Sequence, residues 1–135
     1  MEAKTLVALY PRLFHMAEQG TWTRIRQDGL LSTSALLDRY DVHGTDRVAL
    51  EQRHRPDKVT LGDAGDHVLL RDQKPMAPSR LGPALQDGLT AEQWYKLLNV
   101  KVFIWAEERK LDESSGPPAA AERGNAIAVA RLKKS

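Results

Sequence analysis

The chain has 135 residues, 41% of them hydrophobic and 28% charged, with a formal net charge of +2 and no cysteine. This length and composition suit one folded globular domain, so we expect a single domain over residues 1–135. The lack of cysteine excludes disulfides, thiolate nucleophiles and sulfur-ligated zinc sites, and it favours a reducing, cytoplasmic location. The small net charge does not by itself indicate a nucleic-acid partner.

The sequence also contains no apolar run near the about 20 residues that a membrane-spanning helix needs. The first residues lack the basic lead and cleavage site of a secretory signal. Aromatic residues make up only 6% of the chain. We therefore expect each of Trp22, Trp94 and Trp105 to anchor the core.

The first predicted elements are a short helix and the strand that follows it. Pro11 interrupts the opening helix, and residues 12–17 then predict an apolar strand. Thr21 is placed to cap a helix that runs to Gly29 and carries Trp22 on its buried face.

Two further short helices are predicted next. Residues 35–40 place Leu36, Leu37 and Tyr40 on one apolar stripe, which is typical of a helix packed on a core. Thr45 is placed to cap another helix, with a strongly charged face, that Pro56 ends.

From residue 58 onward the pattern becomes extended. Residues 59–61 and 67–71 alternate around a turn of Gly and Asp, which predicts a β-hairpin. Residues 75–88 hold three prolines and two glycines, and we expect a loop with at most one helical turn there.

The C-terminal part combines one clear helix with less regular segments. Thr90 and Gln93 fit a capping box, so residues 91–99 should be helical. Residues 100–105 alternate as a central strand would. Residues 112–124 have linker composition and are expected to be mobile, and residues 125–132 predict a last strand.

His15 lies inside the predicted apolar strand, where a core histidine bonded to a backbone carbonyl is a common alternative to a ligand-binding one. The string LFHMAE at 13–18, followed by WTRIRQDGLLS at 22–32, resembles the opening of the ADP-ribosyltransferase-like fold. The resemblance is to its DNA-modifying toxin and RNA 2'-phosphotransferase branches in particular. It implies an α+β fold with a small sheet and short helices, in which the strand-borne histidine begins an NAD pocket.

The same resemblance assigns expected roles to five residues. His15 would hydrogen-bond a ribose hydroxyl of NAD, Arg71 would hold the pyrophosphate, and Lys74 would add a second positive charge. Transferases of this fold commonly stabilise positive charge on the ribose with a glutamate, and Glu107 and Glu108 are the nearest candidates by position. Ordinary solvated roles remain open for Arg71, Lys74 and the two glutamates.

Over a greater length the chain resembles a bacterial domain family with no assigned function. Residues 71–76, 94–99 and 102–105 carry that likeness. It implies no particular chemistry. Metal binding finds no support either, because His43, His54 and His67 have neither helical metal spacing nor carboxylate partners at zinc-site intervals.

Three functions follow as hypotheses. The leading one is an NAD-binding ADP-ribosyltransferase-like domain, an enzyme that would transfer ADP-ribose to a protein or nucleic acid. The alternative is a catalytically inert binding or inhibitory module that acts through a protein partner. A third is nucleic-acid binding through the basic stretch at residues 47–58, for which solvated helix faces are the favoured alternative.

Overall fold

The structure is a computed structural model that describes residues 2–107 and, for residues 125–131, the course of the backbone. Its helices and strands form a mixed α+β protein, as the sequence predicts. Contacts divide the chain into two compact units, Met1–Gln27 with Phe103–Ser135 and Asp28–Val102. We call these the terminal unit and the central unit and describe each by itself; the single domain stays a prediction.

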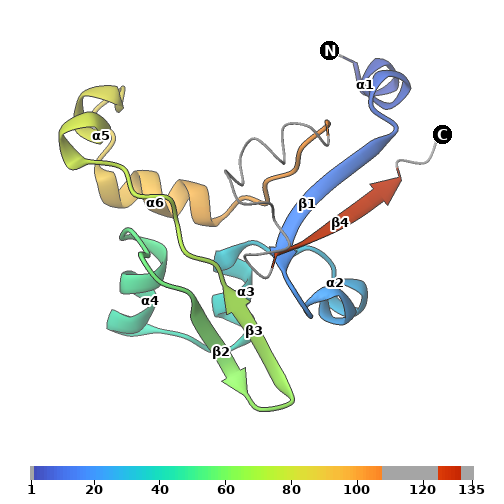
Figure 1. The fold of residues 1–135 in the computed structure, drawn as a ribbon. Helices are drawn as coiled ribbons and strands as arrows, with labels where there is room; N and C mark the ends of the chain where they lie inside the picture. The colour runs from blue at the N-terminus through green and yellow to red at the C-terminus, as the bar shows by residue number, and fades with distance from the viewer. Residues whose placement is uncertain (1, 108–124, 132–135) are drawn as a thin grey trace. The chain divides into compact units, whose positions relative to one another are not determined.

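The terminal unit is built on a pair of antiparallel strands, β1 (Arg12–Glu18) and β4 (Asn125–Arg131). Figure 1 shows that β1 begins and β4 ends at the same end of this pair. Helix α1 (Ala3–Leu9) precedes β1, and α2 (Trp22–Asp28) follows it. The predicted opening helix, first strand and last strand are therefore confirmed.

A short third segment joins the other side of β1. The backbone N–H groups of Phe14 and Trp105 each donate to the other residue's carbonyl, at 2.9 and 2.8 Å. Phe14 and Ala17 are buried. The bridge brings residues around 105 beside β1 although about ninety positions separate them in the sequence.

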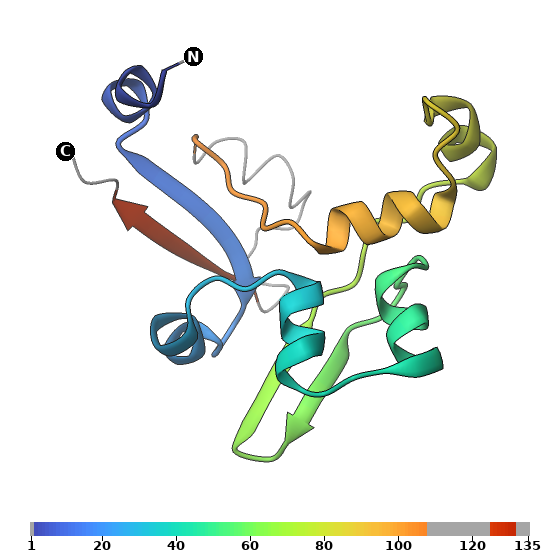
Figure 2. The same ribbon diagram turned by 180° about the vertical axis from the view of Figure 1, so that it is seen from behind.

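The central unit contains a hairpin and four helices. Its strands are β2 (Val59–Asp63) and β3 (Asp66–Leu70), and its helices are α3 (Thr33–Arg39), α4 (Gly44–Glu51), α5 (Pro78–Ala84) and α6 (Ala91–Asn99). Helices α3, α4 and α6 contact one another pairwise. Both ribbon views show the hairpin turn lying away from α6 (Figures 1 and 2).

Three buried leucines, Leu37, Leu61 and Leu70, form the core of the central unit. They join α3 to both strands of the hairpin. Leu37 is fully enclosed, with 0% of its surface exposed, and burying such a side chain contributes about 1.5–3 kcal/mol. The predicted apolar stripe on α3 is confirmed, since Leu36 and Tyr40 pack against this cluster.

Helices α3 and α6 begin with side-chain caps. The Ser32 hydroxyl accepts a hydrogen bond from the Ala35 N–H at the start of α3. Thr90 and Gln93 form the predicted capping box at the start of α6. These bonds satisfy N–H groups that have no partner within the helix.

Several predicted boundaries are wrong. Residues 100–105 form no strand beyond the single bridge at Trp105, and Phe103 is 51% exposed. Residues 78–84 are helical rather than loop, with Pro78 in the first turn, where its missing N–H costs nothing. The alternation of residues 100–105 and the proline content of residues 75–88 reflect local preferences of the chain. The folded structure follows neither preference in these two segments.

One predicted cap and one predicted core residue also differ. The Thr21 hydroxyl donates back to the Glu18 carbonyl at 2.6 Å, which closes the turn before α2, and its role as the cap of that helix stays a prediction. Helix α4 starts at Gly44 with His43 in the cap position, and it ends at Glu51, before the predicted stop. Trp22 is 48% exposed, which is not the burial expected of a core anchor.

Residues 112–124, predicted to be mobile, lie outside the described residues. Within the described ranges, no helix has the length and apolar character needed to cross a membrane.

Candidate functional site

His15 lies in the middle of β1 and is half-buried. Its Nδ1 is 2.9 Å from the backbone carbonyl oxygen of Phe103. A carbonyl oxygen only accepts hydrogen bonds, so the bonded Nδ1 carries the proton and the neutral ring keeps Nε2 as an acceptor. The sequence left a carbonyl-bonded histidine and a ligand-binding histidine as alternatives, and this geometry allows both roles.

The bridge at Trp105 also determines where Glu107 lies. Glu107 follows Trp105 by two residues in the terminal unit and is half-buried. His15 follows Phe14, the bridge partner of Trp105, by one residue. The structure thus brings the segments of His15 and Glu107 together, while Glu108 lies outside the described residues.

Arg71 and Lys74 belong to the central unit. Arg71 follows β3 directly and is half-buried, and Lys74 lies exposed between β3 and α5. The Arg71 carbonyl accepts a hydrogen bond from the Arg55 Nε at 2.8 Å. Their roles toward pyrophosphate stay predictions.

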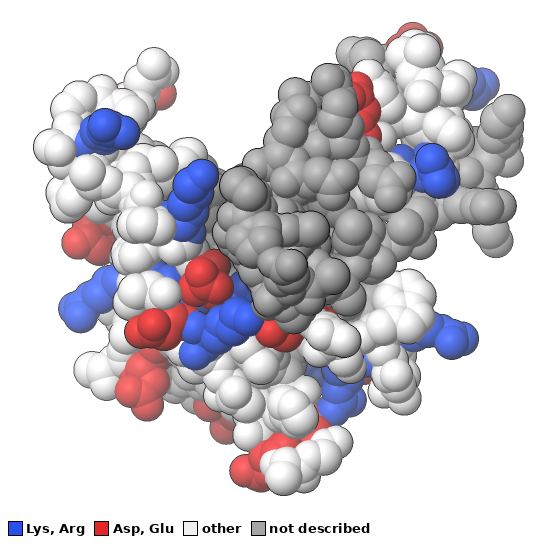
Figure 3. Space-filling view, in the orientation of Figure 1, with Lys and Arg blue, Asp and Glu red and all other residues white. Residues whose placement is uncertain are grey.

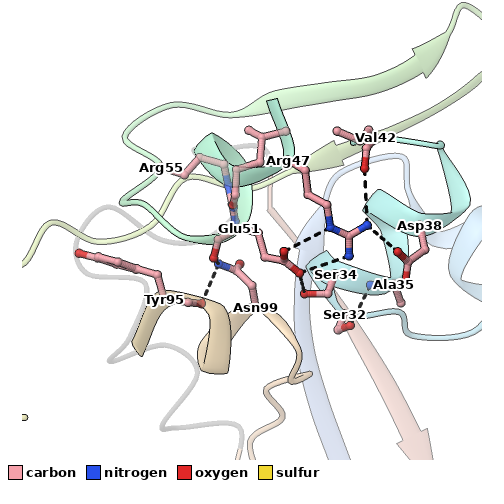
Figure 4. A network of polar contacts seen from close by, with 11 residues as sticks. Ser32, Ser34, Ala35, Asp38, Val42, Arg47, Glu51, Arg55, Tyr95 and Asn99 are labelled. Atoms are coloured by element: carbon pink, nitrogen blue, oxygen red, sulfur yellow. Dashed lines mark hydrogen bonds and ion pairs between the residues drawn. The ribbon is translucent and has the colours of Figure 1, made fainter. Parts of the chain in front are cut away.

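A buried polar network that the sequence analysis missed lies between α3 and α4 (Figure 4). The Ser34 hydroxyl donates to Glu51 Oε1 at 2.6 Å, and Arg47 donates to both Glu51 oxygens, at 3.2 and 3.4 Å. The other side of the Arg47 guanidinium donates to Asp38. Glu51 is only 4% exposed. Its buried carboxylate is held by hydrogen bonds from two neighbouring side chains, Ser34 and Arg47.

Burial by itself would raise the pKa of Glu51, because a carboxylate loses hydration in the interior. The hydrogen bonds from Ser34 and Arg47 outweigh that effect and hold the pKa of Glu51 below its ordinary value. The carboxylate is therefore ionised and saturated with donors. This arrangement suits a structural ion pair better than a proton-transfer site.

Two further buried polar residues tie this region to its neighbours. Asn99 at the end of α6 donates to the Glu51 carbonyl at 2.9 Å, which joins α6 to α4. Arg55, 6% exposed, donates to the carbonyls of Leu50 and Arg71 at 2.8 Å. Burial lowers the pKa of Arg55, and the nearby charge of Asp72 partly offsets this.

These contacts change the interpretation of the basic stretch at residues 47–58. The side chains of Arg47 and Arg55 donate hydrogen bonds within the central unit. The description of this stretch as solvated helix faces is therefore wrong for these two residues. On the face drawn in Figure 3, blue and red atoms are interspersed over the described residues. The part of this face that the structure describes therefore carries no continuous basic surface of the kind that binds phosphates.

The central unit also contains a hollow of about 600 Å³. Its walls come from residues 52–54, from the segment of Met76, from α5 and from residues 85–95. We call it the α5–α6 hollow. Two of its ring-bearing side chains, His54 and Tyr95, lie with ring centroids 6.3 Å apart at an interplanar angle of 49°.

His54 is held in place from outside the hollow. Its Nε2 is 3.0 Å from the Gln73 carbonyl oxygen. Gln73 is itself anchored, because its N–H donates to the Arg55 carbonyl and its side-chain oxygen accepts from the Arg55 N–H. Sequence reasoning treated His54 as one of a basic run, and no local signal would have placed it in a cavity wall.

No group of three or more His, Asp or Glu residues that could hold a metal occurs among the residues that the structure describes.

Comparison of the sequence with models of known protein families identifies the family of this chain. The model described as Family of unknown function (DUF7002) matches residues 11–133, which includes both β1 and β4 and the whole central unit. The chain belongs to this family. Membership in DUF7002 agrees with the predicted likeness to a domain family with no assigned function. No curated protein and no solved structure matches the chain.

Proposed function

We propose that this chain is an ADP-ribosyltransferase-like domain that binds NAD and transfers ADP-ribose to a protein or nucleic acid. The proposal rests on the resemblance of residues 13–32 to the opening of that fold. One structural observation supports it most directly: His15 is held on β1 by the Phe103 carbonyl while its ring remains half-buried rather than enclosed.

The tautomer of His15 suits a ribose ligand. With Nδ1 donating to Phe103, Nε2 is the acceptor that a ribose hydroxyl needs for its own hydrogen. The same bond fixes the plane of the ring, so little side-chain freedom remains to be lost when a ligand binds. This acceptor nitrogen is the feature of His15 that supports a ribose ligand in the proposal.

Glu107 is the candidate for stabilising positive charge on the ribose. It lies on the segment that the Trp105 bridge brings beside β1, and it is half-buried. A carboxylate in such a site favours positive charge that develops as the bond from ribose to nicotinamide breaks. Glu108 remains the second candidate by sequence position.

The first test is a calorimetric titration of NAD into the parent protein and into His15→Ala. We expect the variant to bind at least about tenfold more weakly, which corresponds to the loss of roughly one hydrogen bond. His67→Ala is the control, because His67 is an exposed histidine on β3 of the central unit. Absence of NAD binding by the parent protein would eliminate the proposal.

A second candidate is the catalytically inert binding or inhibitory module that acts through a protein partner. It rests on the sequence around the candidate acids, because neither Glu107 nor Glu108 stands in a recognisable transferase motif. An NAD hydrolysis or transfer activity that is lost in Glu107→Gln or Glu108→Gln would count against it. A stable complex with one purified protein, formed without NAD turnover, is the result that this candidate expects.

A further inference from the structure

We propose that the α5–α6 hollow binds a flat heteroaromatic small molecule that carries a hydrogen-bond donor. This site is separate from the NAD proposal, which rests on His15 of the terminal unit, because every residue of the hollow belongs to the central unit.

Size and lining support a small-molecule site. A volume of about 600 Å³ lies in the range of pockets that enclose drug-sized ligands, on the order of 300–1,000 Å³. Apolar side chains such as Met76, Leu81 and Leu85 line it, and His54 and Tyr95 add rings. Such pockets gain affinity from apolar burial and orientation from a few polar groups.

The rings favour a flat ligand. The planes of His54 and Tyr95 are tilted by 49° and their centroids are 6.3 Å apart, so they form a tilted pair within the about 4.5–7 Å range at which aromatic rings attract one another. Both residues line the hollow, where the ring of a flat ligand would extend this pair. Met76 also lines the hollow, and its thioether is a group that makes favourable contacts with aromatic rings.

His54 is the polar group proposed to orient the ligand, because its ring is fixed by a hydrogen bond; other polar residues that line the hollow are Gln52, Arg53, Thr90 and Glu92. Its Nε2 faces the Gln73 carbonyl at 3.0 Å and must carry the proton, so the neutral ring offers Nδ1 as an acceptor. Backbone and side-chain bonds between Gln73 and Arg55 hold that carbonyl in place. A ligand N–H or O–H would complete the bonding of the imidazole.

The arrangement of the walls favours a small molecule over a peptide. A peptide helix lies along a groove on one continuous face. The walls of the hollow come instead from separate segments around it: residues 52–54, Met76, α5 and the start of α6. Binding of an amphipathic peptide is therefore the competing outcome of the test.

The experiment titrates two probes into the isotope-labelled full chain and follows backbone amide shifts by NMR. Benzimidazole carries a ring N–H, and 1-methylbenzimidazole has nearly the same shape without it. We expect both to shift amides of residues 52–54, 76–85 and 89–95, with dissociation constants on the order of 1 mM for such small probes. Benzimidazole should bind about three- to tenfold more tightly, as expected for one hydrogen bond.

Two variants locate the site and its acceptor. His54→Ala should remove the difference between the two probes, whereas His67→Ala should preserve it. Gly82→Phe should weaken both probes at least about fivefold, because Gly82 lines the hollow and a Cβ built there meets no atom within 4 Å. Because this space is open, we expect Gly82→Phe to keep the fold of the parent protein. The NMR spectrum of its backbone amides checks this expectation.

Three results would overturn the proposal. These are the absence of shifts with either probe, shifts confined to other residues, and equal affinities for the two probes in the parent protein. Binding of an amphipathic peptide at the hollow, in place of both probes, would equally contradict it. Amide shifts that NAD causes around His15 would test the proposed NAD-binding function and would not test the proposal for the α5–α6 hollow.

Discussion

At the scale of single residues, the best-defined feature of the molecule is the buried carboxylate of Glu51. It accepts hydrogen bonds from Ser34 and Arg47, and its backbone carbonyl accepts one from Asn99. One residue therefore links α4 to both α3 and α6. Breaking a buried charged pair by removing one partner is destabilising, because the remaining group loses both water and its partner.

We expect Glu51→Gln to lower the free energy of unfolding at pH 7 by about 1–3 kcal/mol. The amide keeps the size of the side chain but removes the charge that Arg47 faces. Urea unfolding followed by circular dichroism measures the change. Asp57→Asn, an exposed acid in the same unit, is the matched control and should change stability by less than about 0.5 kcal/mol.

The lowered pKa of Glu51 sets the sign of its pH dependence. Its stabilising contribution is complete above the ordinary glutamate pKa of about 4.3 and is lost as the pH falls through the lower, folded-state pKa. The stability difference between the parent protein and Glu51→Gln should therefore shrink in acid. A difference that stayed constant from pH 7 to pH 3 would contradict this account.

At the scale of elements, the β2–β3 hairpin shows how close packing fixes one glycine. Gly62 has φ of +87°, a region that other residues rarely adopt. A Cβ added there would lie 2.2 Å from the Asp66 carbonyl oxygen and 2.5 Å from the Tyr40 ring. The ring of Tyr40, the residue that follows α3, thus packs against the hairpin because this position lacks a side chain.

We expect Gly62→Ala to destabilise the protein by more than about 1 kcal/mol, through backbone strain and displacement of Tyr40. Thermal unfolding measures the effect. Gly65→Ala is the matched control, because Gly65 also has positive φ but a Cβ there meets no atom within 4 Å. Equal losses in both variants would mean that backbone strain, and not the contact with Tyr40, accounts for the effect.

At the scale of the whole chain, the notable contact is the pairing of β1 with β4, which joins residue 12 to residue 131. Phe14 points its N–H toward Trp105. Because N–H groups alternate along a strand, those of Leu13 and His15 point toward β4. The two edges of β1 are therefore covered by different parts of the chain.

We expect truncation after residue 124 to expose one edge of β1. Hydrogen exchange should become faster at the amides of Leu13 and His15, while the amide of Phe14 keeps more of its protection through Trp105. An exposed strand edge also promotes association, which light scattering measures. Unchanged exchange at His15 after truncation would contradict the pairing of β1 with β4.

The sequence by itself determined the elements whose signals are local. Thr90 and Gln93 specified the start of α6, the stripe of α3 gave its buried face, and the Gly and Asp turn gave the hairpin. Each depends on residues a few positions apart, where capping bonds and periodicity act directly. The position of His15 within β1 was predictable for the same reason.

Only the tertiary structure decided features that depend on residues far apart in the chain. The pairing of β1 with β4, the Phe103 carbonyl beside His15 and the burial of Glu51 all arise from such contacts. The segment at 100–105 alternates as a strand would, yet it forms one bridge because a strand also needs a partner along its length. Local sequence preferences favour a particular helix or strand. The free energy of long-range packing then determines whether that element forms in the folded protein.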